Sequence, residues 1–424
     1  MSELAVVKPQ STEQVSKVLA SCNACAQPLI IRSGASVGEA IVRAEPGDVI
    51  LSLERMDAIE HMDPIDRTAL VQAGVSVRNL HERAGAHALS MPTGLGGAMP
   101  RHVGSCAAAS LGGAHTFHHG PMRHQILGLE AVLADGRIIS SLKRLVAGNA
   151  GCDPEQLFIG SGGRLGVITR LALRLHDNPT SRCTVLVSVQ AFDQLIGLFG
   201  LMKQALKGSL AAFEFLDRDF YAMSVRHSHA ASPLAKGCPY YAIIESFGFS
   251  DERHGDLVES AVRVGLKDGL IFDAVIARTD NAQRAIWNLH HNLRNFAHDY
   301  CPFDVFSIRI PVPTMAPCMD SIKNRIRARW PDALVSFSGS IATASLHAAL
   351  SAGMASREDR RYVSHCILES LAVCEGSAPI AWGAGSSDRL VLDGGGNDDE
   401  QSIVCSLKAL FDPENILNPR RTTL

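Results

Sequence analysis

Hydrophobic and polar residues recur with regular periods along the chain, and these periods predict alternating helices and strands. Near the N-terminus, Ser11 and Gln14 have the spacing of a helix capping box. The apolar residues that follow share one helical face: Val15, Val18, Leu19 and Cys22. Short apolar runs at 28–34 and 48–56 predict strands. The pattern therefore indicates a first helix that is followed by two strands.

The same analysis predicts three further units before residue 176. Residues 68–85 have the pattern of a strand, a glycine turn and a helix. At 127–140, two β-rich runs meet at Asp135-Gly136, a dipeptide typical of hairpin turns. Residues 157–175 predict a glycine-rich turn, then a short helix, then a strand.

The composition changes at 176–183, which predicts a domain boundary there. Beyond it, the apolar segments "LDRDF", "YYAIIESFG" and "FDVFSIRIPVP" predict strands, separated by helices such as 281–299. This order is typical of an α+β domain with an antiparallel sheet. An acidic, glycine-rich loop is expected at 392–402, and a final helix and tail follow it.

Composition and charge exclude several classes of function. The chain has 424 residues, with 40 basic and 43 acidic residues, so its net charge of -3 gives no basic surface for nucleic acid or anionic membranes. Its most apolar segment, "QLIGLFGLM", is too short to span a bilayer. No secretory signal is recognised at the start, so we expect a cytoplasmic protein. The eleven cysteines are then expected to be mostly buried thiols.

Glycine-rich turns follow several of the predicted strands, and the backbone of such turns can approach a phosphate closely. They contain Gly34, Gly94, Gly96, Gly97, Gly104, Gly112, Gly113, Gly160, Gly162, Gly163 and Gly166. Together they favour an extended cofactor that bears phosphates. The sequence contains no P-loop motif, and no dinucleotide-binding G-x-G-x-x-G opens its first strand-helix unit.

The segment "AHTFHHGPMRH" (114–124) places four histidines within eleven residues. Its spacing alone is compatible with a metal site, a catalytic cluster or a structural role. These three alternatives stay open at the level of the pattern.

Three segments carry a resemblance to a known family: "HHGPMRHQILGLEAVLADGRIIS", "LFIGSGGRLGVITRLALRL" and "FDPENILNPRR". They resemble the FAD-linked oxidases of the vanillyl-alcohol oxidase and p-cresol methylhydroxylase superfamily, and within it the D-2-hydroxyacid dehydrogenases acting on D-lactate, glycolate or D-2-hydroxyglutarate. The resemblance implies an α+β fold with a PCMH-type FAD-binding domain at 1–176, a cap domain with an antiparallel sheet at 177–395, and a C-terminal segment at 396–424 that returns to the FAD domain.

The resemblance also implies which residues contact FAD. They lie in five segments: Arg32, Ser33, Gly34, Ala35 and Ser36; Pro92, Thr93 and Gly94; Gly104, Ser105, Ser110, Gly112 and Gly113; Gly166, Val167 and Ile168; and Asn418. His119-Gly120 occupies the place of a family Tyr-Gly pair, which favours a structural or flavin-packing role for the histidine segment over catalysis by His118 or His119 and over metal binding. Ala35 and Ser36 stand where covalent members carry a histidine, so a non-covalent flavin is expected.

The hydroxyacid branch holds a divalent metal with residues that this sequence lacks. The matching stretch "SGSIATASLH" keeps His347 but has Ser340 at the first ligand position, and "AWGAG" has Ala381 and Trp382 where glutamate and histidine are expected. One imidazole cannot build a zinc site, so no metal is expected. Trp382 is expected to fill the space of the lost metal.

Charged residues are rearranged in the cap rather than simply lost. His290 and His291 stand at a family Arg-Glu pair, with Arg294 one helical turn after His290, and Arg309 stands at a serine. We therefore hypothesise that Arg309 or Arg294 binds an anionic group. His290, His291 or His347 would remove a hydroxyl proton while hydride passes to FAD.

The sequence thus predicts a FAD-dependent oxidoreductase that oxidises a hydroxylated small molecule, such as a 2-hydroxyacid, without a metal. The alternative is a catalytically degenerate flavin-binding subunit of a complex that resembles glycolate oxidase. The substrate, the electron acceptor and the assembly, either a homodimer or a subunit of a flavoprotein complex, are left open.

Overall fold

The computed structural model describes residues 4–32, 44–92, 102–145, 151–228, 232–249, 253–291, 296, 300, 303–352, 356–374, 376–384 and 398–419. Contacts between residues divide the chain into two compact units. Unit 1 comprises Met1–Asn178 and Gly396–Leu424, and unit 2 comprises Pro179–Gly395. Within the described residues, every helix is too short or too polar to serve as a membrane span.

The N-terminal part of unit 1 is a small parallel sheet with one helix. Strands β1 (Ala5–Val7), β3 (Val49–Ser52) and β2 (Leu29–Arg32) pair in that order. Helix α1 (Thr12–Ala24) begins at Ser11, whose side chain accepts a hydrogen bond from the Gln14 N–H. Val15, Leu19 and Cys22 are buried, so the predicted helix and the structural role of Cys22 are confirmed.

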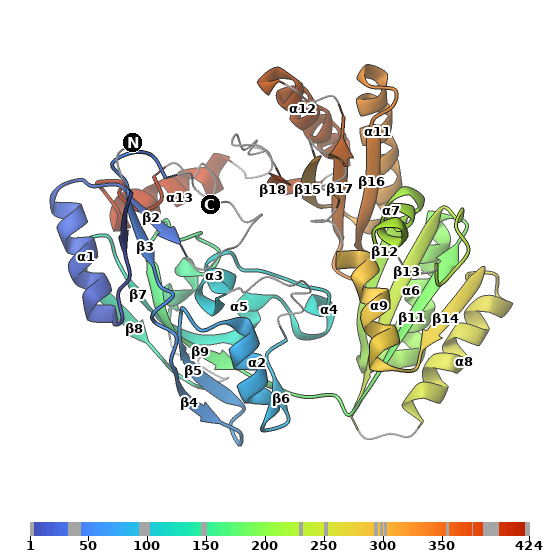
Figure 1. Ribbon diagram of the computed structural model, residues 1–424, viewed down its shortest axis with the longest axis horizontal. Coiled ribbons are helices and arrows are strands. Elements are labelled where there is room, and N and C mark those ends of the chain that lie inside the picture. The colour runs from blue at the N-terminus through green and yellow to red at the C-terminus, as the bar shows by residue number, and fades with distance from the viewer. Residues whose placement is uncertain are drawn as a thin grey trace. The chain divides into compact units, whose positions relative to one another are not determined.

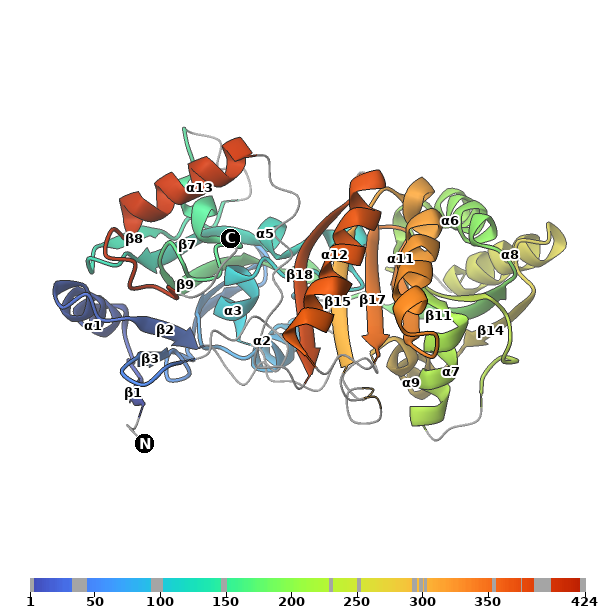
Figure 2. The same cartoon turned by 90° about the horizontal axis from the view of Figure 1, so that it is seen from above.

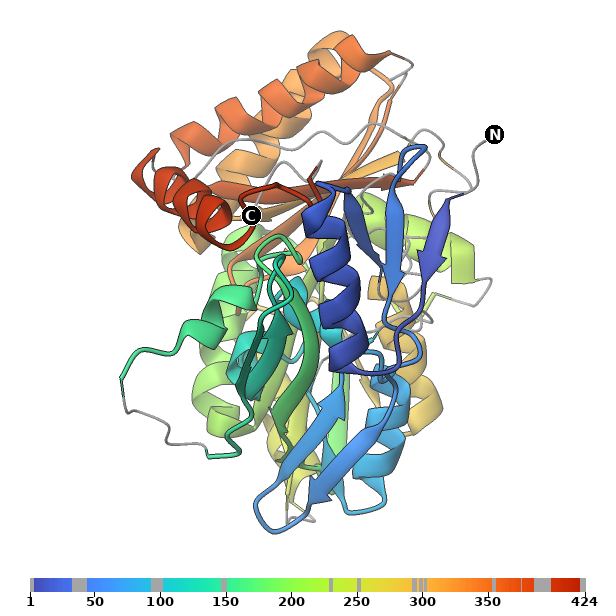
Figure 3. The same cartoon turned by 90° about the vertical axis from the view of Figure 1, so that its left-hand side faces the viewer.

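Unit 1 also contains an antiparallel sheet of five strands in the order β4-β5-β9-β7-β8. The strands are β4 (Ile59–Asp63), β5 (Thr68–Gln72), β9 (Val167–Arg174), β7 (Ile126–Val132) and β8 (Ile138–Ser141). Helix α2 (Val77–Gly85) follows β5, as predicted. The β7–β8 hairpin turns at Gly136, also as predicted, and α1 lies against it through a hydrogen bond from the Ser16 hydroxyl to the Gly136 carbonyl (Figure 3).

Short elements complete unit 1. They are β6 (Leu89–Ser90), β10 (His176–Asp177), α3 (Val103–Ala108), α4 (Thr116–His119), α5 (Met122–Gln125) and the 3₁₀ helix Pro154–Phe158.

The prediction of a short helix after the glycine-rich turn was wrong. The helical turn, Pro154–Phe158, lies before the glycines, and the chain then runs directly into β9. Gly160, Gly162 and Gly163 all have positive φ, which prevents a right-handed helix there. The Gly160 and Gly162 N–H groups instead donate to the carbonyls of Ala107 and Ala108 at the end of α3.

Unit 2 is built on one antiparallel sheet of eight strands in the order β14-β11-β13-β12-β16-β17-β15-β18, which confirms the α+β class. The strands are β14 (Asp273–Ala277), β11 (Ser181–Val189), β13 (Tyr240–Gly248), β12 (Leu210–Asp217), β16 (Leu334–Ser340), β17 (Ser345–Ser351), β15 (Phe303–Arg309) and β18 (Ser377–Ala384).

Helices cover both faces of this sheet (Figures 1 and 2). Helices α7 (Arg218–Ser228) and α9 (Asp280–His291) pack on the face that carries Leu216 and Ile243. The other face carries Phe213 and Phe337, and its helices are α6 (Phe192–Leu206), α8 (His254–Lys267), α11 (Met315–Arg329) and α12 (Arg357–Val373). Short 3₁₀ turns lie at Lys207–Ser209 and Val312–Thr314.

Two predicted boundaries in the second half of the chain were wrong. "LDRDF" is not a strand throughout, because β12 ends at Asp217 and the Asp217 carboxylate accepts a hydrogen bond from the Phe220 N–H, which starts α7. The loop expected at 392–402 gives way to helix α13 (Asp398–Phe411), and 392–397 lie outside the described residues.

The C-terminal segment is fixed to unit 1 by buried charges. Lys408 Nζ donates to the carbonyls of Arg164 and Leu417, and it also contacts the Asp412 carboxylate. Asp412, which is 1% exposed, accepts hydrogen bonds from the N–H groups of Ile416 and Leu417. Leu417 also forms a bridge with Leu29 of β2, so the tail is held beside the first sheet.

We predict that Asp412→Ala will lower the free energy of unfolding by about 3 kcal/mol, because it leaves the Lys408 ammonium buried without its partner. Glu414→Ala removes an exposed carboxylate two residues further along and is the matched control. Urea unfolding followed by circular dichroism measures the difference. Equal stability of the two variants would show that the buried ion pair does not hold the tail.

Candidate functional site

Segments of unit 1 that are far apart in the sequence meet at the end of β2. The turn at 160–163 is hydrogen-bonded to the end of α3, which lies two residues before Ser110. Gly163 also packs against Ile31 of β2, where a Cβ would lie 2.9 Å from Ile31 Cδ1. Arg32, the turn that contains Ser110 and the tail therefore converge on one region. These segments carry predicted FAD contacts, so their convergence fits an extended cofactor.

Asn418 ties this region together. Its Oδ1 accepts a hydrogen bond from the Ile31 N–H at 3.0 Å, and its Nδ2 donates to the Gly162 carbonyl at 3.0 Å. Asn418 is 2% exposed and has a φ of 44°. Its amide therefore fixes the backbone around the predicted cofactor segments and is occupied by these backbone bonds.

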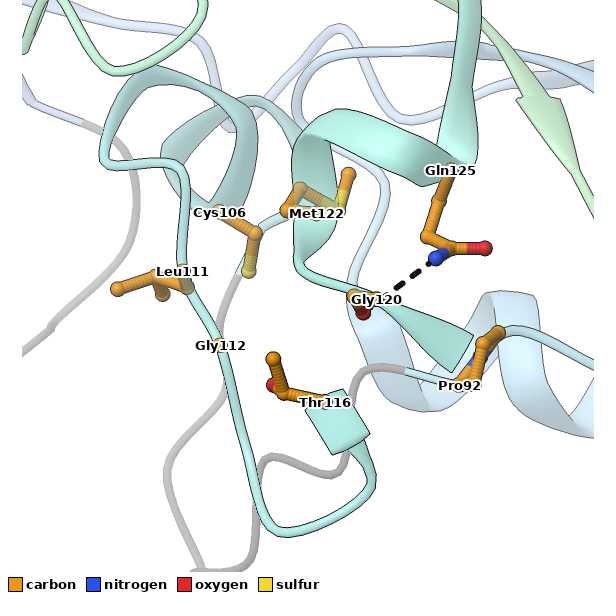
Figure 4. A pocket seen from close by; sticks show the side chains of 8 residues that line it. All are labelled: Pro92, Cys106, Leu111, Gly112, Thr116, Gly120, Met122 and Gln125. Atoms are coloured by element: carbon orange, nitrogen blue, oxygen red, sulfur yellow. Dashed lines mark hydrogen bonds between the residues drawn. The ribbon is translucent and has the colours of Figure 1, made fainter. Parts of the chain in front are cut away.

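Two of the predicted segments line one small cavity (Figure 4). Pro92 and Gly112 lie on its wall together with Gly120 and Gln125, and its volume of about 10 Å³ has room for roughly one water molecule. The Gly113 N–H nearby donates to the Thr116 hydroxyl at 2.7 Å. The structure thus brings the segment at Pro92 close to the turn at Gly112, as a shared cofactor region requires.

The histidine segment is packed into unit 1 in short helical turns. The ring of His119 lies 4.4 Å from that of His118 and 4.5 Å from that of His176. His176 Nε2 is bonded to Gln125 Oε1 at 2.8 Å. Burial, together with the neighbouring histidines, lowers the pKa of His119 to about 3. Burial, together with the charge of Arg174 and with His118, lowers the pKa of His176 to about 4. Both rings are therefore neutral near pH 7.

The remaining predicted FAD contacts have different surroundings. Gly104 packs closely on Ala73, since a Cβ would lie 2.6 Å from the Ala73 Cβ, and the Ser105 hydroxyl donates to the His102 carbonyl. Gly166 lies beside Phe158, and the Val167 and Ile168 side chains belong to the core, so only their backbone atoms could meet a ligand. Ser33, Gly34, Ala35, Ser36, Thr93 and Gly94 lie outside the described residues.

In unit 2, polar residues form two rows across one face of the sheet. In the first row Glu214 pairs with Ser340, Ser340 with Ser345, and Ser345 with Arg309. In the second row Ser338 pairs with His347, and His347 with Ser307. Paired residues project from the same face of a sheet. Arg309 and His347, which the sequence singled out, therefore share a surface with Glu214.

Helix α9 adds His290 to this surface. His290 Nε2 lies 3.4 Å from Glu214 Oε2, and the side chains are 15% and 7% exposed, respectively. Burial lowers the pKa of His290 to about 4. Burial, with smaller contributions from the charges of His290 and Arg309, lowers the pKa of His347 to about 3.

His347 is oriented by its neighbour on β15. Its Nδ1 is 3.1 Å from the Ser307 hydroxyl. Because one ring nitrogen is engaged and the ring is neutral, the imidazole has the form that can accept a proton.

On α9, Trp287 lies one helical turn before His290, and His291 directly follows His290. The rings of Trp287 and His291 stack with centroids 5.7 Å apart, and the Trp287 Nε1–H donates to Glu245 Oε1 at 3.0 Å. His291 thus belongs to an aromatic stack next to a second buried carboxylate. Arg294 and the side chain of Trp382 lie outside what the structure describes.

Sequence reasoning missed Glu214 and Glu245. Both are nearly fully buried, at 5% and 3% exposure, in strands that are mostly apolar. A charged residue inside an apolar strand, as in "LAAFEFLD", is the signal that could have found them, because a buried carboxylate requires a partner.

No group of three or more His, Cys, Asp or Glu side chains in the described parts of the chain could hold a metal ion.

The comparisons with known proteins agree with this architecture. Residues 4–141 match the family described as "FAD binding domain", and residues 178–422 match "FAD linked oxidases, C-terminal domain". The second match covers more than half of the chain. The chain belongs to the FAD-linked oxidase family, and FAD is its cofactor.

Individual relatives cover nearly the whole chain. It is 26% identical over 420 residues to a mitochondrial D-2-hydroxyglutarate dehydrogenase of Danio rerio, covering 98% of this chain and 78% of the relative. It is 25% identical over 422 residues to the D-2-hydroxyglutarate dehydrogenase of Stutzerimonas stutzeri, covering 98% and 90%. The solved structure "alkyldihydroxyacetonephosphate synthase in P1" has a TM-score of 0.74 at 16% identity, over 98% of this chain and 76% of that one, which supports the fold.

We predict that Asn418→Gly will lower the free energy of unfolding by about 2 kcal/mol and reduce the FAD content of the purified protein. The glycine tolerates the positive φ, so the change removes only the amide and leaves two buried backbone groups without partners. Asn415→Gly is the matched control, since Asn415 has a φ of 50° and is exposed. Wild-type FAD content in the Asn418 variant would contradict the role assigned to this amide.

Proposed function

We propose that the chain is a FAD-dependent dehydrogenase of a 2-hydroxyacid, and that the polar face of unit 2 binds the substrate. The observation that carries the proposal is the shared face of Arg309, His347 and His290, with neutral imidazoles beside a guanidinium. The names of the relatives from Danio rerio and Stutzerimonas stutzeri support this substrate class.

In the proposed chemistry, two side chains act on different groups of the substrate. The Arg309 guanidinium binds the carboxylate, since its planar donors match a carboxylate with two hydrogen bonds. His347 then accepts the hydroxyl proton as the C–H hydrogen leaves with its electron pair. The product is a 2-oxoacid, and the proton resides on the imidazole. FAD, when bound, supplies the two-electron acceptor for this hydride.

Glu214 and His290 form the support of this proposed site. The Glu214 carboxylate lies 3.4 Å from His290, whereas His290 and Arg309 both disfavour the protonated form of His347. A carboxylate near the imidazoles favours the cation that forms when one of them takes up a proton. This would offset part of the cost of a positive charge close to Arg309.

Several finer properties belong to the same proposal. The FAD is bound non-covalently and the reaction needs no metal. The cytoplasmic location stays a prediction, and the relative from Danio rerio is named as mitochondrial. The proposal names no electron acceptor and no assembly.

The direct test is anaerobic reduction of the purified, flavin-loaded protein by a panel of D- and L-2-hydroxyacids, including D-lactate, glycolate and D-2-hydroxyglutarate. We expect bleaching of the flavin absorbance by at least one of them, at the same rate with and without EDTA. A rate that EDTA abolishes and zinc restores would contradict the metal-free proposal. Reduction by dithionite but by no member of the panel would favour the flavin-binding subunit.

Single substitutions separate the proposed roles. Arg309→Gln should raise KM by about 100-fold, because it removes a charged contact made throughout the reaction, whereas His347→Gln should mainly lower kcat, by about 100-fold or more. Arg278→Gln is the control, since Arg278 is exposed and pairs with Glu259. The roles are wrong if Arg309→Gln and His347→Gln reduce the flavin as fast as the control does.

A further inference from the structure

A second hollow lies on the opposite face of the sheet in unit 2. It has a volume of about 400 Å³, within the size range of small-molecule sites. Its walls come from the end of β12, the start of α7, the start of β13 with the residue before it, β16 and α11. Successive side chains of a strand point to opposite faces. The Asp217 side chain therefore points to the face with this hollow, while Glu214 and Leu216 face α7 and α9. The hollow is therefore separate from the proposed substrate face.

The hollow contains a buried carboxylate, and only one of its two oxygens accepts a hydrogen bond within the part of the fold that the structure describes. Asp217 is 6% exposed, and its Oδ1 caps α7 by accepting from the Phe220 N–H at 2.8 Å. Its buried Oδ2 has no hydrogen-bond partner among the described residues. Lys323 Nζ lies 3.7 Å from it, which is close enough for attraction but too far for a hydrogen bond.

Helix capping does not explain this second oxygen. A serine or asparagine would cap α7 equally well without a buried charge. Burial raises the pKa of Asp217 to about 7, while the Phe220 N–H, Lys323 and a weaker interaction with the Phe337 backbone oppose that shift. A donor placed against Oδ2 would restore the missing hydrogen bond and favour the ionised carboxylate.

The remaining lining balances this negative charge. Asp219 and Asp320 add two carboxylates, and Lys323 lies 3.9 Å from Asp219. Arg218 and Arg327 add two exposed guanidiniums, neither of which has a carboxylate within 4.0 Å among the described residues. The aromatic rings of Tyr240 and Phe337 provide apolar surface between the charges. A ligand with a single sign of charge would meet repulsion from part of this lining.

We propose that this hollow is a binding site for a small zwitterion, whose primary ammonium donates to Asp217 and whose carboxylate is held by Arg218 and Arg327. The ammonium provides the donor that Asp217 Oδ2 lacks. The carboxylate gives the guanidiniums a planar, two-oxygen partner. A short chain of methylene groups between the two ends packs on Phe337.

Isothermal titration calorimetry of the flavin-loaded full chain at pH 8, where Asp217 is mostly ionised, tests the proposal. The probes are 5-aminopentanoate, pentanoate and pentan-1-amine, which carry both charged ends, only the carboxylate, and only the ammonium. We expect 5-aminopentanoate to bind with a Kd of about 1 mM or tighter, and each single-charge probe at least about tenfold more weakly.

Two variants locate the site. Asp217→Asn keeps the cap on α7 but removes the charge, and it should weaken 5-aminopentanoate binding by about tenfold or more. Arg327→Gln changes an exposed residue of α11 and should weaken binding several-fold without affecting the fold. Asp193→Asn, in the first turn of α6, is the matched control and should bind as the wild type does.

Three results would overturn the proposal. They are no heat of binding with 5-aminopentanoate at a concentration on the order of 10 mM, an equal affinity for pentanoate and 5-aminopentanoate, and an unchanged affinity for 5-aminopentanoate in both Asp217→Asn and Arg327→Gln. None of them bears on flavin reduction by hydroxyacids, so the two proposals fail independently.

Discussion

The alternation of side chains along β12 determines where unit 2 places its charges. Phe213 and Phe215 pack under α6, while Glu214, between them in sequence, projects toward α9. Because the strand is paired on both sides, a shift of one residue would exchange the two faces and bury both phenylalanines among polar groups. The apolar core on one face thus fixes the carboxylate on the other.

Burial of ionisable groups then sets the protonation states on the polar face. Glu214, His290 and His347 lie where desolvation is costly, and the imidazoles respond by remaining neutral. Burial leaves each imidazole free to accept a proton, but pKa values of about 3 and about 4 also make these rings weak bases. A carboxylate such as Glu214 must therefore favour the cation when a proton is taken up. The Arg309 side chain is exposed, so an anion can reach it. The polar face thus presents neutral imidazoles and an anion-binding guanidinium on one surface.

Local patterns in the sequence predicted much of the fold. The cap of α1, the hairpin at Gly136 and the antiparallel sheet of unit 2 follow from residues close together in the chain. The errors arose where glycine conformation or a capping side chain decided the outcome, as at 160–163 and at Asp217. Sequence analysis identified Arg309 and His347, because they stand at positions that the resemblance marks as functional.

The support of the candidate site could not be found in this way. Glu214 meets His290 only because β12 and α9 pack together across a long separation in the sequence, which no local period encodes. Asn418 was expected near the flavin, whereas its two hydrogen bonds to Ile31 and Gly162 depend on the return of the tail to unit 1. Such contacts follow from tertiary packing rather than from the secondary-structure propensity of nearby residues.

The account depends most on neutral imidazoles beside Arg309. Nitrogen-15 NMR of the histidine side chains, with resonances assigned by His347→Gln and His290→Gln, measures their protonation directly. Between pH 7 and pH 5, we predict that neither ring will take up a proton, because burial lowers the pKa values to about 3 and about 4. Titration of His347 with a midpoint near 6.5, the value of a solvated imidazole, would contradict the account.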